Sequence, residues 1–389
     1  MSTRIGSTET RWQRGIRADE GALVCRPKTA RADAGAQAGE VYRALVDSLV
    51  DHQASLANLA SEKLFLRDRG ELPEILDARC RVLRELGVVE APPVPTLIQQ
   101  PPVDRDIALE LAASVSVDRV PQTRTGRASG EDLRANLHCA CRVCSGSGGR
   151  LQHLGREAIL NSTIFCGRGE NALAQARDMF CNARRFLENV GMDFHNVVRT
   201  WIYLEDIDRD YAALNQARRE FFEACGLEQR PASTGVQGAP CGEDHVCGLS
   251  LQAISPRPAD LEIMTTPYLN EAWSYGADFS RGLRVVRANG VVLHLSGTAS
   301  IDEAGNSLHL GDLEAQAERM LDNIESLLGE QGADFSSLLS GVIYVKRAAD
   351  AGQLRAVLQR RGFEGFPCVF VEAPLCRPEL LCEAEAVAG

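Results

Sequence analysis

The feature that most constrains the fold of this chain is an internal repeat. Two segments, beginning at Ala176 and Ala317, align without a gap: ARDMFCNARRFLENVGMDFHNVVRTWIYL and AERMLDNIESLLGEQGADFSSLLSGVIYV. In both, apolar residues recur at helical spacing up to a glycine, the pattern of an amphipathic helix and its C-cap. A strand rich in Val, Ile and Tyr follows. Repetition on this scale predicts a fold assembled from copies of one supersecondary unit.

A third and weaker copy begins at Val41: VYRALVDSLVDHQASLANLASEKLFLRD. In every copy a further helix follows, and then a proline-bearing segment: PPVPTLIQQPP, RPASTGVQGAP and FPCVFVEAP. Each copy closes with a short apolar strand. Hairpin-like strands precede the second and third copies, LQHLGREAILNSTIFCG and LRVVRANGVVLHLSG, and the latter carries an Asn-Gly turn, which is a strong hairpin signal. No hairpin is recognisable before the first copy.

The repeating unit is therefore helix, strand, helix, strand, strand, and it predicts an α+β fold in which each unit is a mixed sheet packed by helices. Arg199 interrupts the apolar start of the middle copy's strand, and its charged end is expected to extend to solvent. The expected organisation is an irregular N-terminal segment (1–38), a degenerate unit (39–116), a linker or loop (117–150) and two well-formed units (151–256 and 257–389).

Charge and hydropathy limit the partners. The net charge of −11 argues against nucleic acid, which needs a basic surface, but a local arginine cluster still allows a small anionic substrate. No apolar run approaches the roughly 18 residues needed to span a bilayer, so no membrane association is expected. The N-terminal residues have no apolar core of a secretory signal.

Thirteen cysteines without a secretory signal are interpreted as reduced thiols of a cytoplasmic protein. Cys139, Cys141 and Cys144, beside His138, are the one group that raises the question of zinc. Structural zinc sites use two-residue gaps and a second ligand pair at a distance. Only Cys141 and Cys144 have such a gap, and no matching pair follows. A cysteine-bearing loop without metal is the expectation.

The middle copy carries a family resemblance. NVVRTWIYLEDIDRDYAALNQARREFF, followed by RPASTGVQ, resembles the YjgF/YER057c/UK114 family, the Rid imine deaminases, whose units have a chorismate mutase-like fold. Family members with one unit form trimers with active sites in the clefts between subunits. The resemblance therefore implies that three units in one chain form an intrachain pseudo-trimer with three clefts. Such a chain has no need to form homotrimers, so a monomer or low homo-oligomer is expected.

A more specific resemblance is to the chorismatases of this superfamily, the 3-hydroxybenzoate synthase-like enzymes of secondary metabolism. LHLSGTASIDEAGNSLHLGDLEAQAERMLDNIESLL (293–328) and the C-terminal CRPELLCEAEAVA are similar to that branch. The resemblance implies hydrolysis of the enol ether of chorismate, or of a related small anionic cyclic acid, without metal or cofactor. It places the site in the third unit, with Glu383 as the catalytic acid/base and with these substrate-binding residues: Arg355, Arg281, Tyr275, Ala299, Ser300 and Cys376.

This chemistry needs a general acid that protonates the vinyl carbon, followed by attack of water on the oxocarbenium ion. A glutamic acid kept partly protonated by an apolar environment can supply the proton. Alternation along CEAEAV places Glu383 and Glu385 on one face of the final strand, which suits a solvated edge equally well. Chorismate carries two carboxylates, so arginines are expected to line the cleft.

Two other functions stay open. The first is an imine or enamine deaminase using Glu383 or Glu110, although Pro95, Ser233 and Cys368 occupy the positions of the deaminase arginine and Ser250 that of the glutamate in the middle copy. The second is a catalytically inactive pseudo-trimer that binds a small ligand or another protein. The missing arginines favour the inactive pseudo-trimer over the deaminase.

Overall fold

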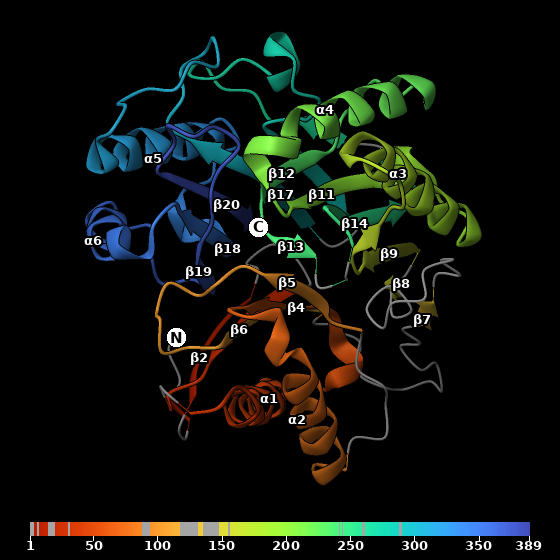
Figure 1. Ribbon diagram of the computed structural model, residues 1–389, viewed down its shortest axis with the longest axis vertical. Helices are drawn as coiled ribbons and strands as arrows, with labels where there is room; N and C mark the ends of the chain where they lie inside the picture. Colours follow the sequence, from red (N-terminus) through yellow and green to blue (C-terminus); the bar gives the residue numbers. More distant parts are fainter. Residues whose placement is uncertain are drawn as a thin grey trace.

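Each of the three sequence units builds one mixed sheet with two helices on its outer face (Figure 1). The computed structural model describes residues 4–5, 8–14, 20–29, 32–87, 94–116, 131–134, 148–154, 156–240, 242, 244–258, 261–287 and 290–389. The expected α+β class with repeated units is confirmed, because strand order and strand direction are the same in all three sheets.

The first unit forms the sheet order β2-β3-β6-β4-β5. Its elements are the strands β2 (Thr8–Arg14) and β3 (Glu20–Arg26), helix α1 (Ala34–Asp51), strand β4 (Leu59–Leu66), helix α2 (Leu72–Glu85), and strands β5 (Thr96–Gln99) and β6 (Leu109–Ser116). Strands β4 and β5 are parallel, and β6 lies antiparallel to both β4 and β3.

The second unit has the order β12-β11-β14-β9-β8. Its elements are β8 (Gly148–Leu154), β9 (Glu157–Ser162), α3 (Ala172–Asn189), β11 (Val197–Leu204), α4 (Ile207–Ala224), β12 (Ala232–Gln237) and β14 (Cys247–Ser255).

The third unit has the order β16-β17-β20-β18-β19. Its elements are β16 (Gly282–Arg287), β17 (Gly290–Ala299), α5 (Leu313–Gly329), β18 (Leu338–Val345), α6 (Ala351–Arg360), β19 (Cys368–Glu372) and β20 (Cys382–Ala388).

Five short strands extend these sheets: β1 (Arg4–Ile5), β7 (Glu131–Arg134), β10 (Phe165–Cys166), β13 (Ala239–Pro240) and β15 (Leu261–Ile263). Strand β13 follows the second unit's β12 in the chain but pairs with β5 of the first unit. The sheets of these two units are therefore joined by backbone hydrogen bonds as well as by side-chain packing.

The N-terminal residues differ from their expected irregularity. Residues 1–38 contain the antiparallel hairpin of β2 and β3 and the first turn of α1. The sequence hides this hairpin because β2 lies near the sheet edge and is mostly polar. Strand β3 is a short run whose five central residues are all buried, without the alternation that marks a half-exposed strand. The first unit consequently has the same hairpin as the other two.

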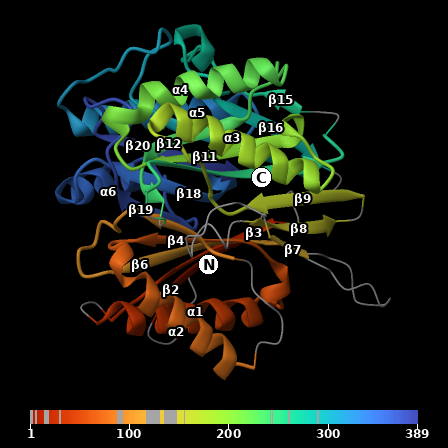
Figure 2. The ribbon, with the colours of Figure 1, turned by 45° about the vertical axis from the view of Figure 1, so that its right-hand side comes forward.

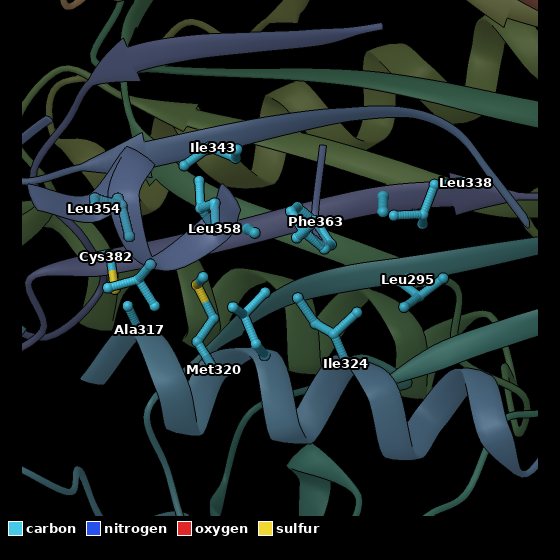
Figure 3. Packing of buried hydrophobic residues seen from close by; sticks show 14 of the residues in the cluster. Leu295, Ala317, Met320, Ile324, Leu338, Ile343, Leu354, Leu358, Phe363 and Cys382 are labelled. Carbon is cyan, nitrogen blue, oxygen red and sulfur yellow. The ribbon is translucent and has the colours of Figure 1, made fainter. Parts of the chain in front are cut away.

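Two kinds of core hold the molecule together. Within each unit, the helices pack on the outer face of the sheet. Figure 3 shows this for the third unit, where Met320 of α5 points toward Leu358 of α6 and Ile324 points toward Phe363. A separate core lies where the inner faces of the three sheets meet, and it includes Phe65, Tyr203 and Tyr344 from β4, β11 and β18. Figure 2 shows the helix pair α1 and α2 at the far side of the first sheet from this junction.

Among the described residues, no helix has both the length and the apolar character needed to cross a membrane.

The inner faces of the three sheets meet in one shared core, so we expect the chain not to form an obligate homotrimer. Light scattering on the purified protein should give the mass of one chain, 42.3 kDa, or of a small multiple such as a dimer. A particle of three chains that persists on dilution would contradict this expectation.

Candidate functional site

The final strands of the three units define three corresponding positions. In the antiparallel pairing with the central strand, Glu110 lies opposite Phe65, Gly248 opposite Tyr203, and Glu383 opposite Tyr344. The middle copy's counterpart of Glu383 is thus Gly248 and not Ser250, because the register places Ser250 opposite Trp201, at the level of Glu385. Two of the three units carry a carboxylate at this position.

The three positions differ in the space around them. A Cβ atom on Gly248 would lie 2.6 Å from Ile164 and 3.0 Å from Pro240, so no glutamate fits there. Glu110 is fully buried and accepts a 2.7 Å hydrogen bond from Arg26. Glu383 lines a cavity, and its unit is the one in which the sequence places the site.

This cavity, of about 240 Å³, lies between helix α4 of the second unit and strands β17 and β20 of the third. Its walls come from both units, so neither unit could form it alone. The residues that line it are Tyr211, Asn215, Arg218, Ser233, Gly235, Tyr275, Gly276, Ala277, Phe279, Arg281, Gly297, Ala299, Ile301, Cys376, Arg377, Leu380 and Glu383.

The Glu383 carboxyl is held in a nearly dry environment. Its residue is 4% exposed, and no hydrogen bond reaches it from the residues that the structure describes. Burial, reinforced by the negative charge of Glu385, raises the pKa of Glu383 to about 8. Gly297 makes room for it, since a Cβ atom there would lie 2.0 Å from its Oε1. Glu383 is therefore a neutral acid at pH 7, able to donate a proton.

Two arginines of the third unit flank the aromatic ring of Tyr275. The Arg281 guanidinium lies 5.1 Å from the ring centroid and that of Arg377 lies 5.6 Å from it. Arg281 also donates to the Tyr275 hydroxyl and, at 3.0 Å, to the carbonyl of Asn270. Arg377 donates to the Ser307 hydroxyl at 3.3 Å. These contacts fix both cations at the cavity wall.

The opposite wall belongs to α4. Arg218 is 3% exposed and donates a 2.7 Å hydrogen bond to Asn215, while its Nε is buried and makes no hydrogen bond among the described residues. Burial lowers the pKa of Arg218 and raises that of Tyr211. Burial also raises the pKa of the Cys376 thiol to about 12, so that it is neutral and unreactive. The cavity thus combines one neutral acid with three cations.

The structure brings five of the seven predicted site residues to this cavity: Glu383, Arg281, Tyr275, Ala299 and Cys376. Ser300 does not line it, because its buried hydroxyl turns away and donates to the carbonyl of Leu308 at 3.2 Å. Arg355 lies on α6 in a different cleft. The placement of Arg355 could not be read from the third unit alone, since each cleft takes its helix from a neighbouring unit.

Five polar lining residues were missed: Tyr211, Asn215, Arg218, Ser233 and Arg377. Signals for them were present. Arg377 directly follows Cys376 in the motif that marks the site, and Asn215 and Arg218 belong to the polar pattern of the helix after the middle strand. Only the tertiary structure shows that this helix of the second unit covers the acid of the third.

Glu385, the second acid of the final strand, has a structural partner instead of solvent. It accepts 2.8 Å hydrogen bonds from Arg199 and from the Trp201 indole, both on β11 of the second unit. Arg199 is 1% exposed, so its expected extension to solvent is wrong. The Arg199–Glu385 ion pair joins two sheets beside the cavity and fixes the strand that carries Glu383.

No group of three or more His, Cys, Asp or Glu side chains within the described residues could hold a metal ion. The zinc question itself concerns Cys139, Cys141 and Cys144, which lie outside the described residues. The nine cysteines that the structure does describe are all free thiols.

Comparison with known proteins places these observations in a family. The model of the family described as Endoribonuclease L-PSP matches residues 153–244 and 275–389. A 3-hydroxybenzoate synthase of Streptomyces hygroscopicus is 28% identical over 52% of this chain, and a chorismatase of Streptomyces rapamycinicus is 26% identical over 50%. Each alignment spans 65% of the relative's length. A crystal structure of a chorismatase shares the fold, with a TM-score of 0.63 and 16% identity over 86% of this chain and 93% of that one.

Proposed function

This chain belongs to the Endoribonuclease L-PSP family, and on that premise we propose that it is a chorismatase-like enzyme of the family. Its reaction is hydrolysis of the enol ether of chorismate, or of a closely related cyclic acid with two carboxylates, with Glu383 as general acid and base. The observation that carries the proposal is a buried carboxyl with a pKa of about 8 in a cavity walled by three arginines. Similarity to relatives named for this chemistry supports it.

The reaction follows from the protonation state of Glu383. Its carboxylic acid protonates the terminal vinyl carbon, and the positive charge develops on the ether-bearing carbon as an oxocarbenium ion. The carboxylate left behind then accepts a proton from the attacking water. The hemiketal that forms then breaks the bond between its ketal carbon and the ring oxygen. Its hydroxyl proton is transferred to that oxygen, so pyruvate and a hydroxylated ring acid are released. The vinyl ether and one water are consumed, and Glu383 ends protonated as it began.

The three arginines of the cavity bind the carboxylates of the substrate. Arg281 and Arg377 on the third unit and Arg218 on the second face the cavity from opposite sides, so two carboxylates of one ligand can be bound at once. Tyr275 and Phe279 provide flat apolar surfaces for a ring. A dianionic ligand also favours the neutral form of Glu383, because a further negative charge raises the pKa of a carboxyl.

The direct test is incubation of the purified chain with chorismate and measurement of pyruvate. We expect pyruvate and a ring acid in equal amounts. Absence of pyruvate at high enzyme concentration would overturn the proposal. Ammonia release from freshly generated 2-iminobutyrate would indicate a deaminase instead, and a co-purifying ligand without either activity would indicate a binding protein.

The pH dependence of the reaction should report Glu383. Because the acid form is the active one, kcat/KM is expected to be level below about pH 7 and to fall above pH 8, approaching about tenfold per pH unit. The profile is measured as initial pyruvate release in buffers of constant ionic strength. A rate that rises between pH 7 and 9 would contradict the assignment of Glu383 as the proton donor.

A further inference from the structure

Arg355 belongs to a second cleft, distinct from the Glu383 cavity. This cleft, of about 260 Å³, lies between the hairpin β2–β3 of the first unit and α6, β18 and β19 of the third. The residues that line it are Arg11, Val24, Arg26, Ile343, Arg355, Leu358, Gln359, Phe363, Glu364, Phe366, Cys368 and Phe370. The inner face of one unit and the helix of another form its walls, as they do in the Glu383 cavity.

Positive charge gathers on one side of this cleft. Arg11 and Arg26 come from adjacent strands of the first unit, and Arg355 comes from α6 of the third. All three guanidinium-bearing side chains line the cleft. Burial and then repulsion from Arg26 lower the pKa of Arg355, the nearby Glu110 carboxylate opposes that shift, and Arg11 adds to it. The acid lining the cleft is Glu364, an exposed side chain at its mouth.

Most of the remaining lining is apolar. Phe363 and Phe366 pack edge to face with ring centroids 5.1 Å apart, and Phe370 lies under the Arg355 guanidinium at 4.7 Å. Ile343 and Leu358 are buried beside them. The cleft therefore presents a cationic side and an aromatic side to the same enclosed space, an arrangement that suits an anionic head on an apolar ring.

The cleft differs chemically from the Glu383 cavity. Glu110, which corresponds to Glu383 in strand register, is fully buried behind Arg26, accepts its 2.7 Å hydrogen bond and does not line the cleft. No lining side chain here is positioned as a proton donor in the way Glu383 is. What the cleft retains is the ability to bind an anion.

We propose that this cleft is a binding site for a small ring monocarboxylate, separate from the Glu383 cavity and not engaged in the reaction there. The carboxylate lies among Arg11, Arg26 and Arg355, and the ring packs on Phe363, Phe366 and Phe370. Inorganic phosphate would use the cations but leave the aromatic side unfilled, so it should bind more weakly. The site does not depend on the function proposed above.

The test is calorimetric titration of the full chain with benzoate, which has this chemistry and no enol ether. Arg355→Ala is expected to weaken this binding at least tenfold. The matched control is Arg360→Ala on the same helix, whose side chain pairs with Glu314 and Glu318 of α5 outside the cleft, and it should leave the affinity unchanged. Arg281→Ala separates the two sites, because it alters only the Glu383 cavity. Thermal melting of each variant checks its fold.

Each outcome decides the proposal. Benzoate binding lost in Arg355→Ala and retained in Arg281→Ala and Arg360→Ala supports it, as does weaker binding of phosphate than of benzoate. Binding lost only in Arg281→Ala would place benzoate in the Glu383 cavity and overturn it. Equal losses in Arg355→Ala and Arg360→Ala would mean unspecific attraction to charge and would also overturn it, as would no benzoate binding at millimolar concentration.

Discussion

Replacing Glu383 by glutamine is expected to reduce pyruvate release from chorismate by roughly 10²- to 10⁴-fold, the usual contribution of a positioned general acid. Glutamine keeps the shape and the polarity of the side chain but has no proton to donate to a vinyl carbon. KM should change little, because the arginines that bind the carboxylates remain. The measurement is steady-state kinetics with a pyruvate-coupled assay.

The chain offers a matched control for this variant. Glu110 has the same residue type at the same register position of the first unit, but its carboxyl lies behind Arg26 in another part of the molecule. Glu110→Gln should therefore leave turnover within a few-fold of the unchanged chain. Equal losses in both variants would indicate a structural effect and would sink the assignment of Glu383.

The stability of Glu383→Gln gives a second measurement. The variant is expected to lose activity but to gain stability. The pKa of Glu383 is about 8 in the folded chain, against the ordinary value of 4.5 expected after unfolding. Folding therefore requires uptake of a proton as the pH rises from 4.5 toward 8, and stability falls across that window. The variant avoids this loss and should be more stable by up to about 3 kcal/mol at pH 7, with no difference near pH 4. Chemical denaturation at the two pH values measures it.

Arg199→Ala is expected to cost about 3–5 kcal/mol of stability, because it leaves Glu385 buried without its charged partner. The pair lies at 2.8 Å with side chains 1% and 7% exposed, and Arg199 also donates to Thr234 at 2.5 Å. Both contacts lie at the meeting of the second and third sheets. The loss should appear as a lower denaturant midpoint measured at neutral pH.

An exposed ion pair of similar length serves as the control. Arg43 and Glu85 lie 2.9 Å apart, but their side chains are 52% and 51% exposed, so Arg43→Ala should change stability by less than about 1 kcal/mol. The double variant Arg199→Ala/Glu385→Gln should recover part of the loss, since the unpaired charge is removed. If Arg199→Ala lowers stability no more than Arg43→Ala does, the buried ion pair does not hold the second and third sheets together.

Much of the fold was predictable because it repeats. The ungapped alignment that begins at Ala176 and Ala317 identified the helix and central strand of two units, and the third unit was found from its fainter copy at Val41. The hairpin of the first unit was missed, because a fully buried strand such as β3 has no alternation for a pattern to detect. The register of the middle copy was also misjudged, since a two-residue slip between Gly248 and Ser250 preserves alternation and leaves no local trace.

The site was predictable in part for a related reason. Glu383 and Cys376 lie within one short C-terminal segment, so the resemblance of that segment identified both of them. Arg355 was assigned to the same cavity because the chorismatase resemblance implies a substrate-binding arginine on that helix, and the structure places it in another cleft. The local sequence shows which helix or strand carries a residue. It does not show which cleft that residue lines, because a cleft between units is lined by residues far apart in the chain.

The sequence by itself determined the repeated α+β unit, its threefold occurrence and the strand on which the acid lies, because amphipathic periodicity and turn chemistry act over a few residues. Only the tertiary structure decided which clefts are open and what faces them. Gly248 packs against Ile164 and Pro240, Glu110 is paired with Arg26, and Glu383 is buried beside Glu385 and opposite α4. Burial and charge raise the pKa of Glu383, and both depend on the contacts of one unit with the next.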